Sequence, residues 1–419
     1  MMFTAITGRN SNLSRKTAVI GGGAAGMMAG IFGAYAGDDI TIFEKNQKVG
    51  RKIYITGKGR CNLTNNCDIK TVIENTPVNA RFLYSALNRF SPRDTMEFFE
   101  SNGLALKTER GNRVFPVSDR AGDVVDTLLR VSRQAGCKIV NKTVSDIVIE
   151  NGIVKSIKAE NKFLEFDKVI IACGGKSYPL TGSTGDGYEF AKKAGHKIIP
   201  LKPSLVPLET LEKIPSECDK LLLKNVSLNV FDTLTNKKIY TDFGELQLMK
   251  YGVSGAIVLS ASSHIREMQS GRYRLDIDLK PALNEEKLDA RLLREISDRK
   301  LNDYEYLMHA FLPKQLINFF IEKSGIPSNK KCSEISRTDR KSIISALKKF
   351  SLTVKSYRPI DEAIVTSGGV DVKEIEPKTM ESKLVKGLHF AGEVIDVDCY
   401  TGGFNLQTAF CTGVVAGEN

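Results

Sequence analysis

The sequence lacks the cysteine and histidine patterns that mark most metal centres and exchangeable disulfides. Its eight cysteines are scattered, and none belongs to a C-x-x-C pair, which gives no sign of a zinc ribbon or a redox disulfide. Its four histidines show no paired ligand spacing. We therefore expect reduced thiols and no metal site.

Long apolar runs are also missing. No stretch approaches the length needed to span a membrane. The first 16 residues, MMFTAITGRNSNLSRK, contain too short an apolar segment for a secretory signal. We expect a cytoplasmic protein without membrane contact, whose N-terminal tail precedes the first strand.

The chain has a formal net charge of +11 over 419 residues, with 42% hydrophobic and 26% charged residues. A basic excess is compatible with nucleic acid, a membrane surface or an acidic substrate. Between residues 283 and 350, however, the basic residues alternate with acids and apolar residues at helical spacing. This pattern is typical of solvated helix faces, so nucleic-acid binding is not expected.

Glycines are concentrated in a short segment near the start of the chain, between an expected strand and an expected helix. In AVIGGGAAGMMAG, residues 18–30, an apolar strand end runs into Gly21, Gly23 and Gly26 and then into a helix of small residues. In such a strand–turn–helix the first glycine permits the tight turn, and the second lets a pyrophosphate approach the backbone. The third lets the helix pack closely on the strand. The phosphates are expected at the helix N-terminus.

A second strand, within DDITIFEKN, ends at Glu44. An acid about 20 residues after the glycine turn is the expected partner of a ribose hydroxyl. The alternative is an ordinary surface acid at a strand end. Glycine turn, strand and spaced acid together predict a dinucleotide site.

Three further glycine clusters cover residues 50–65, 172–187 and 390–410. Each alone could be a tight turn, but together they indicate an extended ligand of the size of FAD. In the last cluster a strand is followed by A-G-E, an aspartate and T-G-G before an apolar helix. The N–H groups at this helix start, between Gly402 and Gln407, could face the flavin C2 carbonyl and stabilise the reduced ring. Asp396 could bind a ribityl hydroxyl or could simply shape a turn.

The motifs resemble those of bacterial NAD(P)/FAD-dependent oxidoreductase flavoproteins, a group that includes aminoacetone oxidase and flavoproteins linked to bile-acid dehydroxylation. The similarity rests on GGGAAG at 21–26, GKGRCNLTN at 57–65, GGKSYP-x-TGSTGDG at 174–187 and AGEVIDVD-x-x-TGGFNLQ at 391–407. The resemblance implies bound FAD and places the segment around Arg60 near its ribityl chain or ring. The expected cofactor contacts are Gly21, Gly23, Ala24, Ala25, Gly26, Glu44, Lys45, Arg51, Lys52, Gly59, Arg60, Cys61, Asn62, Val144, Gly174, Gly175, Gly187, Gly392, Glu393, Asp396, Gly402, Gly403, Phe404, Asn405 and Leu406.

Some residues depart from the family pattern or have a less certain role. Cys173, Cys399 and Ala256 stand where threonine, glycine and proline are usual. Cys399 is either a small buried thiol or a reactive one near the flavin. The hairpin residues Arg113, Phe115 and Pro116 are candidates for the substrate side. No Ser–His–Asp arrangement has convincing spacing, and no catalytic residue is assigned.

The fold class expected is α/β, a Rossmann-like FAD-binding domain with a β-rich insert and a small helical insert. The boundaries predicted are 1–200 for the first part of the FAD domain, 201–282 for a β-rich insert on the substrate side and 283–350 for the helical insert. Residues 351–419 then return through the β-rich insert to the FAD domain. Strand signals in the β-rich insert extend through GAIVLSAS.

The function expected is hydride transfer between flavin N5 and a small organic substrate of the amine, ketone or enone class. Oxygen or NAD(P)H is the candidate second redox partner, although no second G-x-G-x-x-G supports a separate NAD(P) domain. The alternatives are a flavin-dependent RNA-modifying enzyme and a non-catalytic redox sensor. The oligomeric state is left open.

Overall fold

The protein is described here by a computed structural model that covers residues 14–419, so most of the expected N-terminal tail lies outside the described residues. The chain divides into two compact units. Unit 1 comprises the chain up to Ser204 together with Ala363–Asn419, and unit 2 comprises Leu205–Glu362. The first unit is therefore discontinuous in sequence, and the second is inserted into it.

Unit 1 is built on a five-stranded parallel sheet with strand order β19-β10-β1-β2-β6. Its strands are β1 (Lys16–Ile20), β2 (Asp39–Glu44), β6 (Lys138–Asn141), β10 (Lys168–Ile171) and β19 (Leu388–Phe390). The central strands β1 and β10 are buried along almost their whole length, as expected of a parallel sheet covered on both faces. This arrangement confirms the Rossmann-type α/β class.

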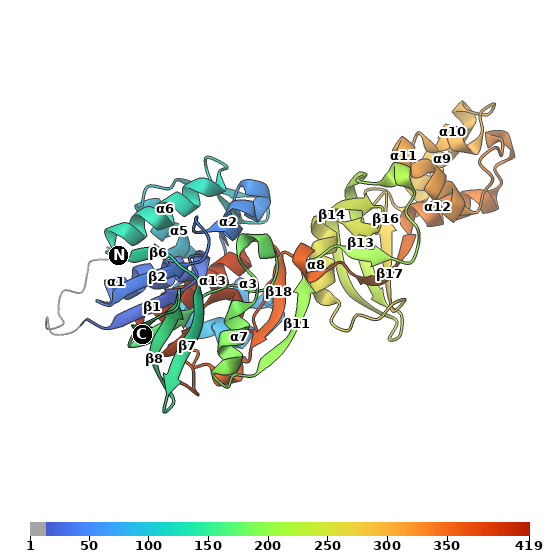
Figure 1. The fold of residues 1–419 in the computed structure, drawn as a ribbon. Coiled ribbons are helices and arrows are strands. Elements are labelled where there is room, and N and C mark those ends of the chain that lie inside the picture. Colours follow the sequence, from blue (N-terminus) through green and yellow to red (C-terminus); the bar gives the residue numbers. More distant parts are fainter. Residues whose placement is uncertain (1–13) are drawn as a thin grey trace. The chain divides into compact units, whose positions relative to one another are not determined.

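Two helices of small residues pack against this sheet, α1 (Ala24–Tyr35) and α13 (Phe404–Glu418), shown in Figure 1. A Cβ atom placed on Gly413 would lie 2.4 Å from the carbonyl oxygen of Ala25, and one on Gly417 would lie 2.4 Å from that of Ala29. The glycines of α13 therefore let it lie directly on the backbone of α1. This contact joins the C-terminus of the chain to the first helix.

The other elements of unit 1 surround the sheet. The predicted helix after Ser91 is α5 (Pro92–Ser101), with a complete capping box, and the amphipathic helix is α6 (Ala121–Gln134). The predicted turn at Asn151–Gly152 joins two strands of an antiparallel sheet. The remaining elements are α2 (Arg51–Ile55), β3 (Thr64–Asn65), α3 (Ile69–Glu74), α4 (Tyr84–Arg89), β4 (Leu106–Glu109), β5 (Arg113–Pro116), β7 (Val144–Glu150), β8 (Ile153–Ala159), β9 (Lys162–Glu165), α7 (Asp186–Lys193), β11 (Ile198–Ser204) and β18 (Val365–Val370).

Unit 2 contains a closed barrel with strand order β12-β15-β14-β13-β16-β17. The strands are β12 (Leu208–Thr210), β13 (Leu222–Asp232), β14 (Lys237–Met249), β15 (Gly252–Ser254), β16 (Tyr273–Asp278) and β17 (Phe350–Tyr357). Four helices lie between β16 and β17 in sequence: α9 (Glu285–Asp298), α10 (Tyr304–Met308), α11 (Lys314–Ser324) and α12 (Arg337–Lys348). Their buried leucine, isoleucine and phenylalanine side chains form one core with the barrel interior.

One local expectation was wrong. The apolar run AIVLSAS has strand composition but forms the helix α8 (Ala256–His264). A short apolar run cannot be assigned to helix or strand by periodicity alone. Gly255, with φ of +98°, ends the strand pairing and starts the helix.

Candidate dinucleotide-binding site

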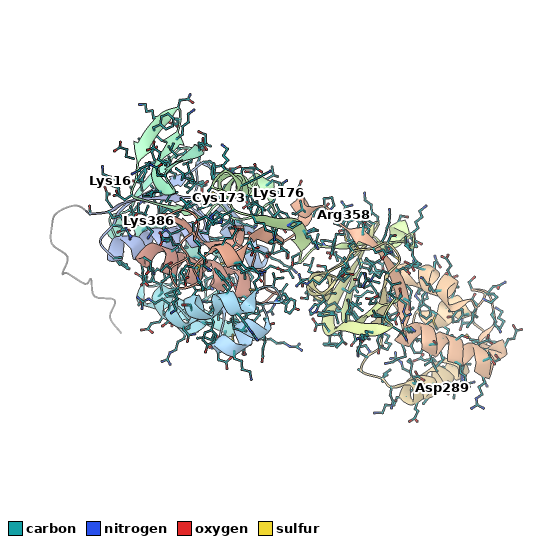
Figure 2. All side chains as sticks on the ribbon, turned by 90° about the horizontal axis from the view of Figure 1, so that it is seen from below. Lys16, Cys173, Lys176, Asp289, Arg358 and Lys386 are labelled. Carbon is teal, nitrogen blue, oxygen red and sulfur yellow. The ribbon has the colours of Figure 1, made fainter. Side chains whose placement is uncertain are left out.

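A pocket in unit 1 lies where β1, β2 and β10 end, the edge at which open α/β sheets bind ligands. Its wall begins with Ile20 at the end of β1, Phe43 and Glu44 of β2, and Ala172 after β10. Segments distant in sequence complete it, namely 23–25, 45–53, 142–144, 181–186, 391–393 and 405–409. Figure 2 shows Cys173, which lines this pocket, and nearby Lys176 on the segment that follows β10.

The three fingerprint glycines have different surroundings. A Cβ on Gly21 would lie 2.4 Å from the carbonyl oxygen of Ala172, and one on Gly26 would lie 1.8 Å from that of Gly21. A Cβ on Gly23 would meet no atom within 4 Å. Gly21 and Gly26 are thus required by protein packing, whereas the space at Gly23 opens into the pocket. A ligand backbone such as a pyrophosphate fits this space.

Helix α1 starts beside that space. Gly23 is its N-cap and provides no side-chain hydrogen bond to the helix N–H groups. Ala24 and Ala25, the first two helical residues, line the pocket. The free N–H groups and the positive end of the helix dipole favour a phosphate at this position.

Glu44 is held in place at the end of β2. One carboxylate oxygen accepts the Gly22 N–H at 2.9 Å, and the other accepts the backbone and side-chain N–H groups of Asn46, both at 2.8 Å. A carboxylate has about four acceptor positions. Glu44 therefore retains acceptor capacity for a ribose hydroxyl while its orientation is fixed by the glycine turn.

Lys52 and Glu393 form an ion pair in the pocket wall. The Lys52 Nζ lies 2.7 Å from Glu393 and donates to Ser177 Oγ at 2.6 Å. The other oxygen of Glu393 accepts the Thr366 N–H at 2.8 Å and the Ser177 hydroxyl at 3.1 Å. Burial would raise the pKa of Glu393, but the Lys52 ammonium and these hydrogen bonds outweigh burial and lower it. The charge of Lys52 is therefore largely balanced by Glu393 before any phosphate binds.

The start of α13 packs directly against protein backbone, a contact that the sequence did not indicate. Gly403, with φ of +97°, caps the helix, and a Cβ there would lie 2.4 Å from the carbonyl oxygen of Thr64. The Asn405 side chain accepts the Cys399 N–H and donates to the Cys399 carbonyl, both at 2.9 Å. Asn405 and Leu406 line the pocket. The double glycine thus has a packing reason of its own, and its contact with a flavin carbonyl stays a prediction.

The segment around Arg60 is tightly constrained. Gly57, Lys58, Gly59 and Cys61 all have φ between +56° and +85°. The Arg60 guanidinium forms ion pairs with Glu109 and Asp119 and lies over the Phe115 ring at 4.3 Å. These contacts hold the loop against the β4–β5 hairpin, and Arg60 does not line the pocket.

Two side chains near the site, Cys399 and Asp396, are held by neighbouring polar groups. Cys399 is fully buried between the hydroxyls of Thr76 and Thr408, and burial raises its pKa to about 11. It is therefore an unreactive packing thiol, one of the two alternatives above. Asp396 accepts a hydrogen bond from the Asn79 side chain at 2.9 Å, and it does not line the pocket.

The structure brings together about half of the predicted contacts. Those that line the pocket are Gly21, Gly23, Ala24, Ala25, Glu44, Lys45, Arg51, Lys52, Val144, Gly174, Gly392, Glu393, Asn405 and Leu406. Those outside its wall are Gly26, Gly59, Arg60, Cys61, Asn62, Gly175, Gly187, Asp396, Gly402, Gly403 and Phe404. The sequence interpretation missed Asn46, Thr181 and Asp186, which also line the pocket. The glycines of TGSTGDG were the available signal for the last two.

A Ser–His–Glu triad that sequence spacing did not reveal lies elsewhere in unit 1. His196 Nε2 lies 2.8 Å from Ser382 Oγ, and Nδ1 lies 3.1 Å from Glu374. Ser382 Oγ also accepts the backbone N–H groups of Leu384 and Val385, so both of its lone pairs are engaged. Because Ser382 is only 7% exposed and its acceptor positions are occupied, the serine holds this loop in place and is not positioned to act as a nucleophile.

The described part of the chain, residues 14–419, contains neither a candidate membrane span nor a candidate metal cluster. No helix there is long and apolar enough to cross a bilayer. No group of three or more histidine, cysteine, aspartate or glutamate side chains there is placed to hold a metal ion.

The parallel sheet, the glycine turn and the pocket at the strand ends define a Rossmann-type dinucleotide-binding protein. The chain belongs to the HI0933-like family, whose Rossmann-domain model matches residues 15–419. The family match, with a reductase among the relatives, confirms the resemblance to oxidoreductase flavoproteins that the sequence motifs indicated.

Named relatives cover nearly the whole chain. The chain is 33% identical over 410 residues to a 3-dehydro-bile acid delta(4,6)-reductase of Clostridium scindens, covering 96% of this chain and 97% of the relative. It is 31% identical over 404 residues to a ribosomal RNA dihydrouridine synthase of Haemophilus influenzae, covering 94% and 95%. A solved 3-ketosteroid-delta4-(5alpha)-dehydrogenase of Rhodococcus jostii shares the fold at 13% identity, with a TM-score of 0.52 and coverage of 99% and 98%.

Proposed function

We propose that the protein binds FAD in the pocket of unit 1 and reduces a carbon–carbon double bond conjugated to a carbonyl group in a small organic substrate. The observation that carries the cofactor assignment is the open space at Gly23 beside the N-terminus of α1. FAD, when bound, supplies hydride transfer at its N5 position. Within the expected amine, ketone and enone classes, the enone is favoured.

The pocket residues have complementary roles in this proposal. The first N–H groups of α1 hold the pyrophosphate, and Glu44 accepts a ribose hydroxyl. Val144 lies in the wall near the end of β2, where the adenine would lie. Lys52 and Glu393 lie in another part of the pocket wall. Because they are already paired with each other, they add little net charge next to the phosphates.

The substrate class rests on chemistry that two kinds of relative share. A 3-oxo steroid with 4,6 double bonds and the uracil ring of uridine both contain a carbon–carbon double bond activated by a conjugated carbonyl. A hydride adds to the carbon distant from the carbonyl, and a proton is added to the carbon next to it. The names of the relatives therefore agree on an activated alkene and differ in the molecule that carries it.

A small molecule is favoured over RNA by the charges of unit 2. Residues 205–362 contain 26 lysine and arginine residues against 22 aspartate and glutamate residues. Many of the arginines are paired within the unit, as in Arg272–Asp232, Arg340–Asp289 and Arg358–Glu209 at 2.9 Å each. A surface that binds RNA through phosphates needs free basic side chains. RNA remains the second candidate because two relatives carry that function in their names.

The decisive experiment is anaerobic reduction of the purified protein by NADH and by NADPH, followed through the flavin absorbance. Reoxidation is then measured with a 4-ene-3-oxo steroid, a simple cyclic enone, an amine, oxygen and ribosomal RNA lacking dihydrouridine. We expect reoxidation by an enone and steady-state turnover. Turnover with RNA alone would favour the second candidate, and the absence of turnover with every pair would favour a redox sensor.

The cofactor itself is tested by releasing it and measuring its mass. We expect FAD, because the glycine turn and Glu44 together need an adenosine half. FMN alone would reject the proposal. The cytoplasmic location and the use of NAD(P)H stay predictions.

A further inference from the structure

A polar strap crosses the edge of the pocket next to Glu44. We define the strap as residues 178–186, which follow β10 and end at Asp186, the first residue of α7. It lines the pocket through Thr181, Gly182, Ser183 and Asp186. Leu180 in its middle is 87% exposed, so apolar burial at its tip does not hold the strap in place.

The strap is attached to the segment after β2 by polar contacts. Lys45 Nζ lies 2.6 Å from Asp186 Oδ2 and donates to Thr184 Oγ1 at 2.6 Å. The Thr184 hydroxyl in turn donates to Asp186 Oδ1 at 2.8 Å. The Asn46 side chain donates to the Thr181 carbonyl at 3.2 Å. Of the residues that make these contacts, all but Thr184 line the pocket.

Asn46, to which the strap attaches on the segment after β2, is held by several further hydrogen bonds. The Asn46 side chain also donates to Glu44 and accepts from Arg51 at 2.9 Å, and its backbone carbonyl accepts from Asn141 at 2.6 Å. A Cβ on Gly182, where φ is +105°, would lie 2.4 Å from the Asn46 amide nitrogen. The strap therefore seats on Asn46 at a position that only glycine can occupy.

We propose that Lys45 and Asp186 form a latch that closes the strap over the adenosine end of the FAD site, so that they position the cofactor and slow its exchange. This inference rests on the proposed function, because it takes FAD as the occupant. The latch is polar and partly exposed, with side chains 28% and 40% accessible. Elements held by few apolar contacts open locally at low free energy, which makes the latch a gate and not a permanent seal.

The test measures FAD exchange on the full-length holoprotein. Release is followed by the rise of FAD fluorescence after dilution into buffer, and rebinding is followed by the quenching of FAD fluorescence when FAD is added to the apoprotein. The variants are Lys45→Met, Asp186→Asn, the double variant, and the charge swap Lys45→Asp with Asp186→Lys. Lys192→Met is the matched control, because Lys192 is exposed on α7, lies outside the pocket and forms no ion pair within residues 14–419.

We expect each single variant to raise both the association and the dissociation rate about 1.4- to fivefold, the range that corresponds to 0.2–1 kcal/mol for an exposed ion pair at 1.36 kcal/mol per factor of ten. The double variant should add nothing further, the charge swap should restore slow exchange, and Lys192→Met should exchange like the unmodified protein. Circular dichroism checks that the variants are folded.

Other results overturn the latch. If Lys45→Met weakens FAD binding while Asp186→Asn does not, and the charge swap fails to restore it, Lys45 contacts the ligand directly. If FAD binds and no variant changes either rate, the strap has no role in exchange, yet the proposed function stands. Failure of the unmodified protein to bind FAD would remove the proposed function and the latch together.

Discussion

Replacing Gly23 by valine tests the cofactor site without disturbing the fold. Gly23 has φ of −85° and ψ of −167°, an extended conformation that valine adopts readily. A Cβ at this position meets no protein atom within 4 Å. The valine side chain would instead fill the space that we assign to the pyrophosphate, and it would separate the phosphate from the N–H groups of α1.

The expected loss follows from the interactions removed. A hydrogen bond to a charged group contributes about 1.5–3 kcal/mol, and a partly buried helix terminus contributes up to about 2 kcal/mol. A loss of about 2–4 kcal/mol corresponds to roughly 30- to 700-fold weaker FAD binding at 1.4 kcal/mol per factor of ten. Since valine is a poorer N-cap than glycine, we also expect a loss of folding stability of about 1 kcal/mol or less.

The assay is the FAD dissociation constant from fluorescence quenching, measured beside circular dichroism and thermal unfolding. Gly26→Ala is the contrasting variant, because its Cβ would lie 1.8 Å from the carbonyl oxygen of Gly21. We expect that variant to lose its fold along with FAD. A folded Gly23→Val protein with unchanged FAD affinity would refute the assignment of the phosphate position.

Three further predictions concern buried polar groups of unit 1. Burial and the nearby Arg15 charge lower the pKa of Lys168 from 10.5 to about 7. The free energy of unfolding should therefore rise between pH 7 and pH 10.5 by up to about 1.4 kcal/mol per pH unit, because only the unfolded chain still binds this proton there. Lys168→Met should remove this pH dependence in urea unfolding, and an unchanged slope would contradict the assignment. Both ring nitrogens of the buried His389 lack a partner in the described structure, so His389→Leu should leave the free energy of unfolding unchanged or raise it, and a clear loss would show a missing partner. Ser382→Ala should lower stability by about 1–3 kcal/mol because it leaves buried donors unpaired, and the unmodified protein should not react with a fluorophosphonate at Ser382; labelling there would show an accessible nucleophile.

The sequence predicted the cofactor fold well because its signals are local. Gly21, Gly23 and Gly26 lie within six residues, and their turn is determined by backbone conformation and by the adjacent strand. Glu44 follows at the spacing that one helix and one strand require. The class of fold and the core of the site could therefore be predicted without knowing any long-range contact.

Other features depend on contacts between distant segments, which spacing does not encode. Gly403 is required by the backbone of Thr64, and the Ser382–His196 pair joins residues 186 positions apart. Lys52 pairs with Glu393, which lies 341 positions further along the chain. The helix α8 was missed because its apolar run is equally compatible with a strand.

The paired strands β11 and β18 have a consequence for engineering. Ser204, the last residue before unit 2, pairs directly with Val365, two residues after unit 1 resumes. The two ends of the insertion therefore lie side by side on neighbouring antiparallel strands, the geometry that an ordinary hairpin turn closes. Unit 2 can be regarded as a cassette carried on a hairpin. We expect its replacement by a short turn to leave unit 1 folded as a minimal Rossmann-type unit.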